Sequence, residues 1–265
     1  MSQFDEKEES PPPFEAGDFQ GATSDEKSQP GSFATPFACI TLNMTDCIRF
    51  INFPREEVSA LYNLIQTSWP KGAREPRLYG GSQEVRLHGS PWSDDFSGNN
   101  NSRRLIRKLL ETLFDRGWIL QAGVDMSKKD QDKDTLVFRY QSPPPPPCDW
   151  LCISFDTWDK LKFVEAPSSD LAGAIFQAFE SRISKHEPKD DCLKLHFRGS
   201  PWYPDGEETV SSRLILMTLL EVLERFGYTL YGSICAQNGH QGTDADVLIV
   251  HRQKDWSPGA PIWHR

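Results

Sequence analysis

Three aspartates at alternate positions have the spacing of a metal-binding loop. Asp130, Asp132 and Asp134 spell D-x-D-x-D, the spacing with which a calcium-binding loop begins. Such a loop needs glycine at its sixth position and glutamate at its twelfth, and this sequence has Thr135 and Gln141 there. We therefore expect a solvated turn between two strands rather than a calcium site.

The cysteines and histidines show no spacing that is typical of a metal or catalytic site. The sequence has no C-x-x-C, H-E-x-x-H, H-x₃₋₅-H or G-x-S-x-G pattern. His88 directly precedes a turn, but the matching position of the second half is Arg198, so both are interpreted as polar strand ends. Cys39 and Cys152 lie at matching strand positions and are expected to be core thiols. The sequence thus predicts no catalytic residue, no cofactor and no metal.

The segment G-S-P-W occurs twice, and each time it leads towards the start of a helix. Backbone N–H groups at a helix start can bind an anion. The loops, however, carry carboxylates that would occupy this positive end of the helix and repel an anion. These carboxylates are Asp94, Asp95, Asp205, Glu207 and Glu208. We therefore interpret the repeated turn as structural.

The repeated turn belongs to an internal duplication. Shifting the sequence by 110 positions aligns the two turns and the helices that follow them, and slightly larger shifts align ACITLNMTDCIRFINFP with LCISFDTWDKLKFVEAP and DTLVFRYQ with DVLIVHRQ. Glycine and proline shape the turn, and tryptophan caps the core beneath it. We expect the matching residues to hold each half together; they are Gly89, Ser90, Pro91, Trp92, Arg103 and Glu111, repeated as Gly199, Ser200, Pro201, Trp202, Arg213 and Glu221.

The predicted fold class is α+β, a tandem duplication with two helices on a mixed or antiparallel sheet in each half. Alternating apolar residues predict strands and amphipathic runs predict helices, in the order ββαβαββ. The first helix of each repeat is expected over 55–68 and 171–184. The predicted segments are a disordered acidic tail (1–36), the first repeat (37–141), a polyproline linker (142–149), the second repeat (150–253) and a C-terminal extension (254–265).

The second helices of the two repeats differ in character. Helix 211–226 is apolar on nearly every side, so we expect it to be buried on more of its circumference, against the other repeat. Helix 102–116 is expected to face water, because it carries Arg103, Arg104, Arg107, Lys108 and Arg116. It lacks interleaved aromatic residues in an acidic protein, which argues against a nucleic-acid partner. A further hypothesis is that the acidic tail folds back on this basic face.

Two segments have compositions suited to protein partners. The first 36 residues hold eight acids against two lysines, so they carry −6 of the formal net charge of −9. This composition predicts disorder, and Phe14 and Phe19 within it are candidate docking residues. The linker prolines contain P-x-x-P and could enter an aromatic-lined groove, although a stiff linker needs no partner. They are Pro143, Pro144, Pro145, Pro146 and Pro147.

The sequence favours a cytoplasmic protein, with a nuclear location as the alternative. The N-terminal residues lack the basic and apolar regions of a signal peptide, so no signal peptide is expected. No run approaches 18 apolar residues, so no membrane segment is expected. Six cysteines without a dense or paired spacing are typical of reduced thiols.

Two classes of function remain open at this stage. The first is a non-enzymatic interaction or scaffold module that docks protein partners through the tail, the polyproline linker or the groove between the repeats. The alternative is an enzyme or small-ligand-binding protein with a pocket between the repeats, near 123–134 and 235–246. That pocket would collect titratable side chains such as Asp125, His196, His240 and Asp244. The sequence does not fix the oligomeric state.

Overall fold

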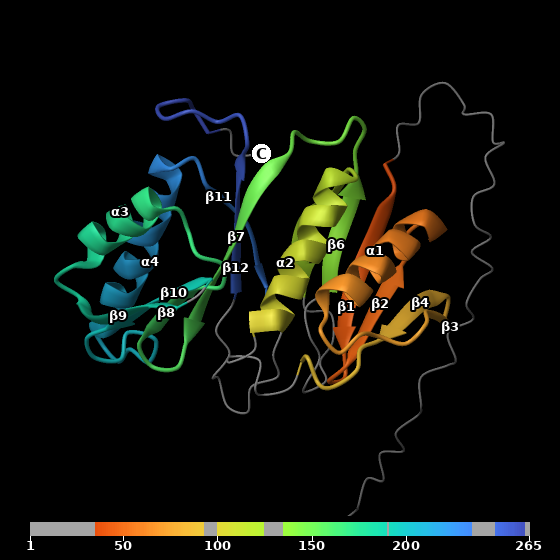
Figure 1. Cartoon of the computed structure of the whole chain (residues 1–265), viewed down its shortest axis with the longest axis horizontal. Helices are drawn as coiled ribbons and strands as arrows, with labels where there is room; N and C mark the ends of the chain where they lie inside the picture. The colour runs from red at the N-terminus through yellow and green to blue at the C-terminus, as the bar shows by residue number, and fades with distance from the viewer. Residues whose placement is uncertain (1–34, 93–99, 125–134, 190, 235–246, 263–265) are drawn as a thin grey trace, which may run out of the picture. The chain divides into compact units, whose positions relative to one another are not determined.

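Each repeat folds into a six-stranded antiparallel sheet with two helices on one of its faces (Figure 1). The predicted fold class, a tandem α+β duplication, is confirmed. Both repeats belong to one unit, Thr35–Arg265. The computed structural model describes residues 35–92, 100–124, 135–189, 191–234 and 247–262.

The strands of the first sheet alternate between buried and solvent-facing side chains. Their bounds are β1 (Phe37–Asn43), β2 (Cys47–Ile51), β3 (Arg77–Tyr79), β4 (Ser82–Arg86), β5 (Trp118–Val124) and β6 (Thr135–Tyr140). The order across sheet 1 is β3-β4-β2-β1-β6-β5. In β1, Ala38, Ile40 and Leu42 are buried while Cys39 and Thr41 on the other face are only partly covered, as the two-residue period of a strand requires.

The second sheet repeats the first strand for strand. Its members are β7 (Cys148–Asp156), β8 (Lys160–Phe163), β9 (Ile183–Lys189), β10 (Cys192–Phe197), β11 (Thr229–Ile234) and β12 (Val247–Gln253). The order across sheet 2, β11-β12-β7-β8-β10-β9, is that of sheet 1 written from the opposite edge. The register also corresponds, because Thr41 pairs with Arg49 in the first hairpin and Ser154 with Lys162 in the second.

Local sequence signals account for the helix starts. Pro54 precedes α1, and Glu56 and Glu57 occupy its first turn, where the helix dipole favours negative charge. Ser168 caps α3 by accepting a hydrogen bond from the Leu171 N–H at 3.4 Å. The bounds are α1 (Arg55–Ser68), α2 (Asn100–Asp115), α3 (Ser169–Phe179) and α4 (Glu208–Arg225).

Each repeat contains one strand more than the predicted order, so the observed order is ββαββαββ. The additional strands are β3 and β9. The three residues of β3 are all exposed, so they give no alternating apolar signal. The predicted helix 171–184 is wrong at its end, because the helix stops at Phe179 and Ile183 already belongs to β9. Apolar Ile183 fits either period, and only pairing with β10 decides between them.

The two G-S-P-W turns make the same contacts in the two repeats. The indole N–H of Trp92 donates to the backbone oxygen of Cys47 at 3.2 Å, and that of Trp202 donates to the backbone oxygen of Lys160 at 3.0 Å. Cys47 and Lys160 are equivalent positions at the starts of β2 and β8. Gly89 and Gly199 both have positive φ, at 89° and 75°. The tryptophan thus ties the turn to the hairpin beneath it in both repeats.

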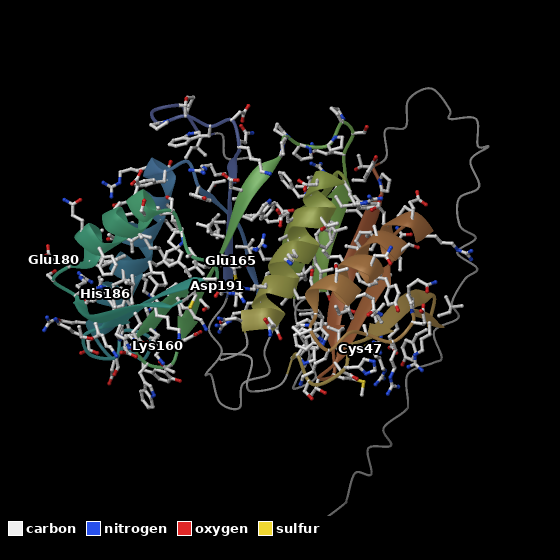
Figure 2. All side chains as sticks on the ribbon, in the orientation of Figure 1. Cys47, Lys160, Glu165, Glu180, His186 and Asp191 are labelled. Carbon is white, nitrogen blue, oxygen red and sulfur yellow. The ribbon has the colours of Figure 1, made fainter. Side chains whose placement is uncertain are left out.

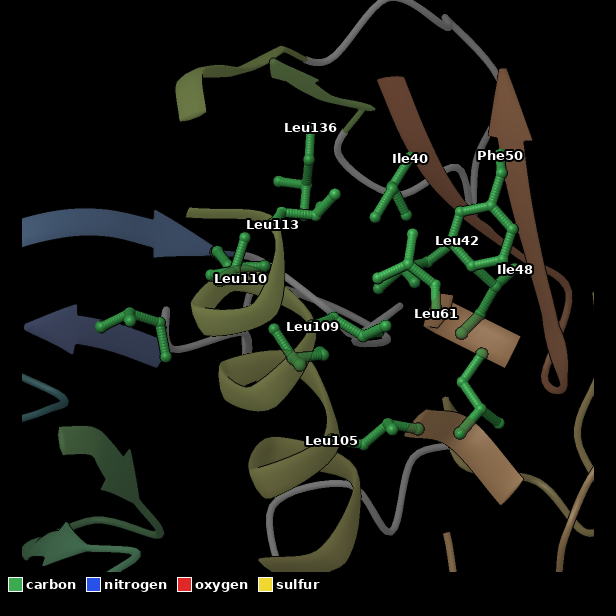
Figure 3. Packing of buried hydrophobic residues seen from close by; sticks show 14 of the residues in the cluster. Ile40, Leu42, Ile48, Phe50, Leu61, Leu105, Leu109, Leu110, Leu113 and Leu136 are labelled. Carbon is green, nitrogen blue, oxygen red and sulfur yellow. The ribbon is translucent and has the colours of Figure 1, made fainter. Parts of the chain in front are cut away.

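Two apolar cores result, and they are not equivalent. The α2 leucines Leu105, Leu109 and Leu113 face Ile40 and Phe50 in the first core (Figure 3). The second core lies between sheet 2 and its helices α3 and α4. The first core, however, also contains buried residues of the second repeat: Cys148, Trp150, Cys152, Val164, Ile234, Val247 and Ile249. Sheet 2 is therefore buried on both faces, and α2 belongs to both repeats.

The predicted environments of the second helices are wrong. Helix α2, expected to face water, has eight buried residues, Arg103 among them, and packs against β7. Helix α4, expected to be buried against the other repeat, has four buried residues and exposes Val210, Leu214 and Met217. Arginines can be buried when they are paired, and apolar residues can stay exposed, so composition alone misassigned the two faces.

We expect Gly117→Ala to lower the free energy of unfolding by more than about 1 kcal/mol, because Gly117 has a φ of 88° and an added Cβ would lie 2.4 Å from the backbone oxygen of Gln141. The matched control is Gly173→Ala, at an exposed position within α3 where an added Cβ meets no atom within 4 Å. This change should raise the free energy of unfolding by about 0.5–1 kcal/mol. Urea titrations measure both, and equal effects would contradict the analysis.

Candidate functional site

The expected groove between the repeats is filled by a buried ion cluster. Arg103 of α2 donates from Nη2 to Oδ1 of Asp156 at 2.6 Å and from Nη1 to Oδ2 at 3.1 Å. The ammonium of Lys162 lies 3.5 Å from the same carboxylate. All three side chains are at most 6% exposed. The cluster joins the repeats through charges that have lost their contact with water.

The other basic residues of α2 are also paired. Arg104 donates to Asp191 and to the backbone oxygen of Val164, and Arg107 Nε donates to Glu165 at 2.9 Å. Figure 2 shows Glu165 and Asp191 on the side of the second repeat that faces α2. Arg116 pairs with Glu57 in α1, and Lys108 contacts Ser68 at 3.3 Å.

The hypothesis that the acidic tail binds this basic face has lost its original basis. Four of the five positive charges that motivated it pair with carboxylates of the folded repeats, and Lys108 contacts the Ser68 hydroxyl. The tail itself lies outside the described residues, together with Phe14 and Phe19.

Aromatic rings close the other end of the interface. Phe114 of α2 makes edge contacts with Trp150, Tyr231 and His251, at centroid distances of 5.1–5.5 Å. The Leu120 N–H of β5 donates to the Tyr231 hydroxyl at 2.9 Å, which links the edge strands β5 and β11. Burial lowers the pKa of His251 to about 4, so this imidazole stays neutral at physiological pH.

In the described part of the chain, α2 packs directly against sheet 2 where a groove between the repeats was expected. It occupies the outer face of sheet 2 with paired charges and rings. The loops 125–134 and 235–246, near which a pocket was expected, lie outside the described residues. His196 lies apart from this interface, with its Nδ1 3.2 Å from Asp159 Oδ2. Asp125, His240 and Asp244 lie outside the described residues. The four are therefore not brought together by anything the structure describes.

The outer face of sheet 1, which points away from α1 and α2, is the open counterpart of the face that α2 covers on sheet 2. We define it by the side chains of Phe37, Cys39, Thr41, Asn43, Arg49, Ile51, Arg77, Tyr79, Glu84, Arg86, Val137 and Arg139. Cys39 and Cys152 illustrate the difference, since Cys152 is fully buried under α2 while Cys39 is partly exposed. The prediction that both are core thiols is wrong for Cys39, because no described helix covers its face.

A buried carboxylate surrounded by arginines lies on this outer face. The Glu84 side chain is fully shielded from solvent (0% exposed). It accepts hydrogen bonds from Arg49 Nε at 2.9 Å and Arg77 Nε at 2.8 Å, and Arg86 Nε lies 3.4 Å away. The Arg49 guanidinium also stacks on the Tyr79 ring, 4.3 Å from its centroid. Asp46 Oδ2 lies 3.6 Å from Arg86 Nη1, so the cluster contains three cations and two anions.

The arginines keep Glu84 ionised. Burial alone would raise its pKa, but the hydrogen bonds from Arg77, Arg49 and the Cys47 thiol lower the pKa of Glu84 to about 2. Burial and the neighbouring carboxylate raise the pKa of Cys47 to about 12, so this thiol is not a nucleophile at neutral pH. Figure 2 labels Cys47 on the first repeat. The arrangement is suited to binding rather than to covalent chemistry.

Sequence reasoning missed this cluster. Arg49, Arg77 and Glu84 belong to three different strands, and no spacing in the chain relates them. The available signal was the matching position in the second repeat: Arg49 corresponds to Lys162 and Glu84 to Lys194, so polar residues recur at strand positions that face away from the helices. Only the pairing of β2, β3 and β4 brings the carboxylate between its arginines.

The repeat-signature residues of the helices lie in unlike places. Arg103 is buried in the interface, whereas its counterpart Arg213 is exposed and donates to the backbone oxygen of Thr209 at 3.1 Å. Glu111 pairs with Arg107 within α2, and Glu221 is exposed on α4.

The linker prolines are accessible. Pro143, Pro144, Pro146 and Pro147 are exposed and Pro145 is half-buried. Backbone hydrogen bonds hold both ends of the segment, from Gln141 N–H to Gly117 and from Lys254 N–H to Pro147. The segment is thus fixed at its ends with its side chains towards solvent.

Within the described residues, no group of three or more His, Cys, Asp or Glu side chains is placed to hold a metal ion. The aspartates 130, 132 and 134 lie outside those residues. None of the described helices combines the length and apolar composition needed to cross a bilayer.

We expect Arg103→Met to lower the free energy of unfolding by about 3 kcal/mol or more, because Asp156 would stay buried with Lys162 as its remaining cation. Arg213→Met removes the equivalent arginine at an exposed position and should change it by less than about 0.5 kcal/mol. Chemical denaturation compares the two. Similar losses would mean that the buried pair is not what distinguishes the positions.

The stability difference between the wild type and Glu84→Gln should depend on pH. A pKa lowered from 4.5 to about 2 stabilises the fold above the unfolded-state pKa, by on the order of 3 kcal/mol, and this contribution is lost as pH falls from about 4.5 towards about 2. Thermal unfolding between pH 7 and pH 3 should therefore show the two proteins converging in acid. Glu180→Gln, at an exposed position, controls for the change in net charge. A constant difference over this range would contradict the ionised, hydrogen-bonded state of Glu84.

Comparison with known proteins gives a family. A protein-family model for an uncharacterised domain matches the chain twice, over residues 36–139 and 149–251. Searches of curated proteins and of solved structures found no significant match. The two matched regions coincide with the two folded repeats and cover most of the sequence, so the chain belongs to this domain family and contains its domain in tandem.

Proposed function

We propose that the protein is a non-enzymatic interaction module whose main binding surface, the outer face of sheet 1, docks a helix of a protein partner. One observation carries the proposal: in the second repeat the equivalent sheet face already holds a helix, α2. The domain therefore contains an example of what this face binds. Residues of the two faces correspond position by position, with Thr41 and Ser154 as one example.

The chemistry of the outer face suits an amphipathic helix. Phe37 and Ile51 are exposed apolar residues at positions where the second repeat has the buried Trp150 and Val164. Arg49, Arg77 and Arg86 form a positive border around Glu84 on the neighbouring strands. An apolar strip beside a charged border is the common arrangement of helix-binding surfaces.

A second docking surface is proposed for the linker. The exposed prolines contain two P-x-x-P pairs, 143–146 and 144–147, and their ends are held by hydrogen bonds. A segment whose two ends are already held loses little entropy when an aromatic-lined groove binds it.

We place the protein in the cytoplasm or nucleus. All five cysteines within the described residues are free thiols, as a reducing compartment maintains them.

The test is affinity purification of the full chain with three matched variants. Ile51→Glu puts a charge on the outer face, while Leu78→Glu puts one on β3 of the same sheet, where the side chain points to the opposite face. Proteins lost with Ile51→Glu and retained with Leu78→Glu support the outer face. Pro144→Ala/Pro146→Ala removes both P-x-x-P pairs and should lose a different set. Identical sets for wild type and Ile51→Glu would refute docking at the outer face.

A further inference from the structure

We infer that the occupant of the outer face of sheet 1 is a second copy of this chain, which docks its helix α4 there. The inference rests on the proposed function, since it needs the same face to bind a helix. Helix α4 is the equivalent of α2, so the contact between two chains would repeat the contact that α2 makes with sheet 2 inside one chain.

The outward face of α4 is more apolar than is usual for the last helix of a repeat protein. In tandem-repeat proteins the last unit normally presents a polar surface to water. Here Val210 is 61%, Leu214 46% and Met217 56% exposed, and together they form an apolar strip along the helix. The equivalents of Leu214 and Met217 in α2 are Arg104 and Arg107, which contact the second repeat. The strip therefore occupies the docking side of the helix.

Where α4 differs from α2, the outer face of sheet 1 differs from that of sheet 2 at the contacting positions. Within the chain, Arg107 of α2 pairs with Glu165 of the second repeat at 2.9 Å. Between copies the same positions are Met217 on α4 and Asn52 beside β2, so both charges disappear. Leu214 replaces Arg104 opposite Ile51, which is 37% exposed and replaces Val164. The ionic contact is replaced by uncharged residues on both surfaces, so no buried charge is left unpaired at these positions.

At the position of Phe114, the contact between two copies would be ionic rather than aromatic. Inside the chain, Phe114 packs on His251 at a centroid distance of 5.1 Å. The equivalent positions are Glu224 on α4 and Arg139 on β6, which have opposite charges and are both exposed. The position of the Arg103–Asp156 pair is taken by Arg213 and Asn43, which retain a donor and an acceptor.

This association is head-to-tail. Each copy offers one α4 strip and one outer face, and the two surfaces are different, so contacts form between unlike patches. The assembly therefore begins as a dimer with one unused surface of each kind and adds further copies as concentration rises.

Sedimentation velocity of the full chain from about 1 μM to about 1 mM tests the inference. The wild-type average mass should rise with concentration. Leu214→Glu/Met217→Glu, which damages the strip, and Ile51→Glu, which damages the outer face, should each weaken association ~10-fold or more. All three side chains are exposed, so the variants should fold. Trp158→Glu, an exposed apolar residue in the turn between β7 and β8, is the control and should associate like the wild type.

Mixing two variants tests whether the association is head-to-tail. An equimolar mixture of the strip variant and the outer-face variant should form a dimer and no longer species, because one intact surface of each kind remains. A mixture that stays monomeric overturns the inference. Met217→Arg and Asn52→Glu restore the charges of Arg107 and Glu165 on separate chains, and their mixture should associate more tightly than either variant alone.

The outcomes separate this inference from the proposed function. A wild type that stays monomeric up to about 1 mM, with partners still lost by Ile51→Glu, overturns the second copy as occupant and leaves the proposed function standing. Unchanged mass together with unchanged partners for Ile51→Glu overturns both.

Discussion

The packing of one helix against two sheets is the constraint on which the rest of this structure depends. Helix α2 turns its leucines to sheet 1 and presents Arg103, Arg107 and Phe114 to the second repeat. Because Arg103 and Asp156 are both withdrawn from water, removing either one would leave the other as an uncompensated buried charge, at a large cost in free energy. The repeats are therefore two copies in sequence but one cooperative unit in packing.

This shared helix makes the surfaces of the two repeats unlike. Sheet 2 is buried on both faces, whereas sheet 1 keeps its outer face open. For the helices the second repeat is the open one, because α2 of the first repeat is buried and α4 of the second repeat exposes an apolar strip. A chain built this way has two different ends, and each end presents the surface that its counterpart buries inside the molecule. The proposed binding roles follow from this polarity rather than from any catalytic group.

The charges of the two sheet faces show how buried carboxylates at different positions can be stabilised in different ways. On sheet 2 the carboxylate of Asp156 obtains its arginine from the other repeat. On sheet 1 the buried carboxylate is Glu84, and its arginines come from β2, β3 and β4 of the same sheet. Sheet 1 thus satisfies its own buried charge without any described helix covering its outer face.

The sequence by itself determined the duplication, the α+β class and most of the helices and strands. These features rest on local signals: α1 was predicted with its observed bounds, Arg55–Ser68, because Pro54, the acids after it and the apolar period all lie within one short segment. The short β3 gave no such signal, because its three residues are all exposed. The structural role of the turn tryptophans was also within reach, since a repeated motif indicates a repeated contact.

Only the tertiary structure decided which helix is shared. The basic residues of α2 suggested a solvent-exposed helix and the apolar residues of α4 a buried one, and the reverse holds. The candidate site has the same origin: Arg49, Arg77 and Glu84 are brought together by strand pairing, and their face is open because α2 covers the other sheet. Burial of a paired arginine depends on a carboxylate more than fifty residues away, and no local pattern in the sequence records that distance.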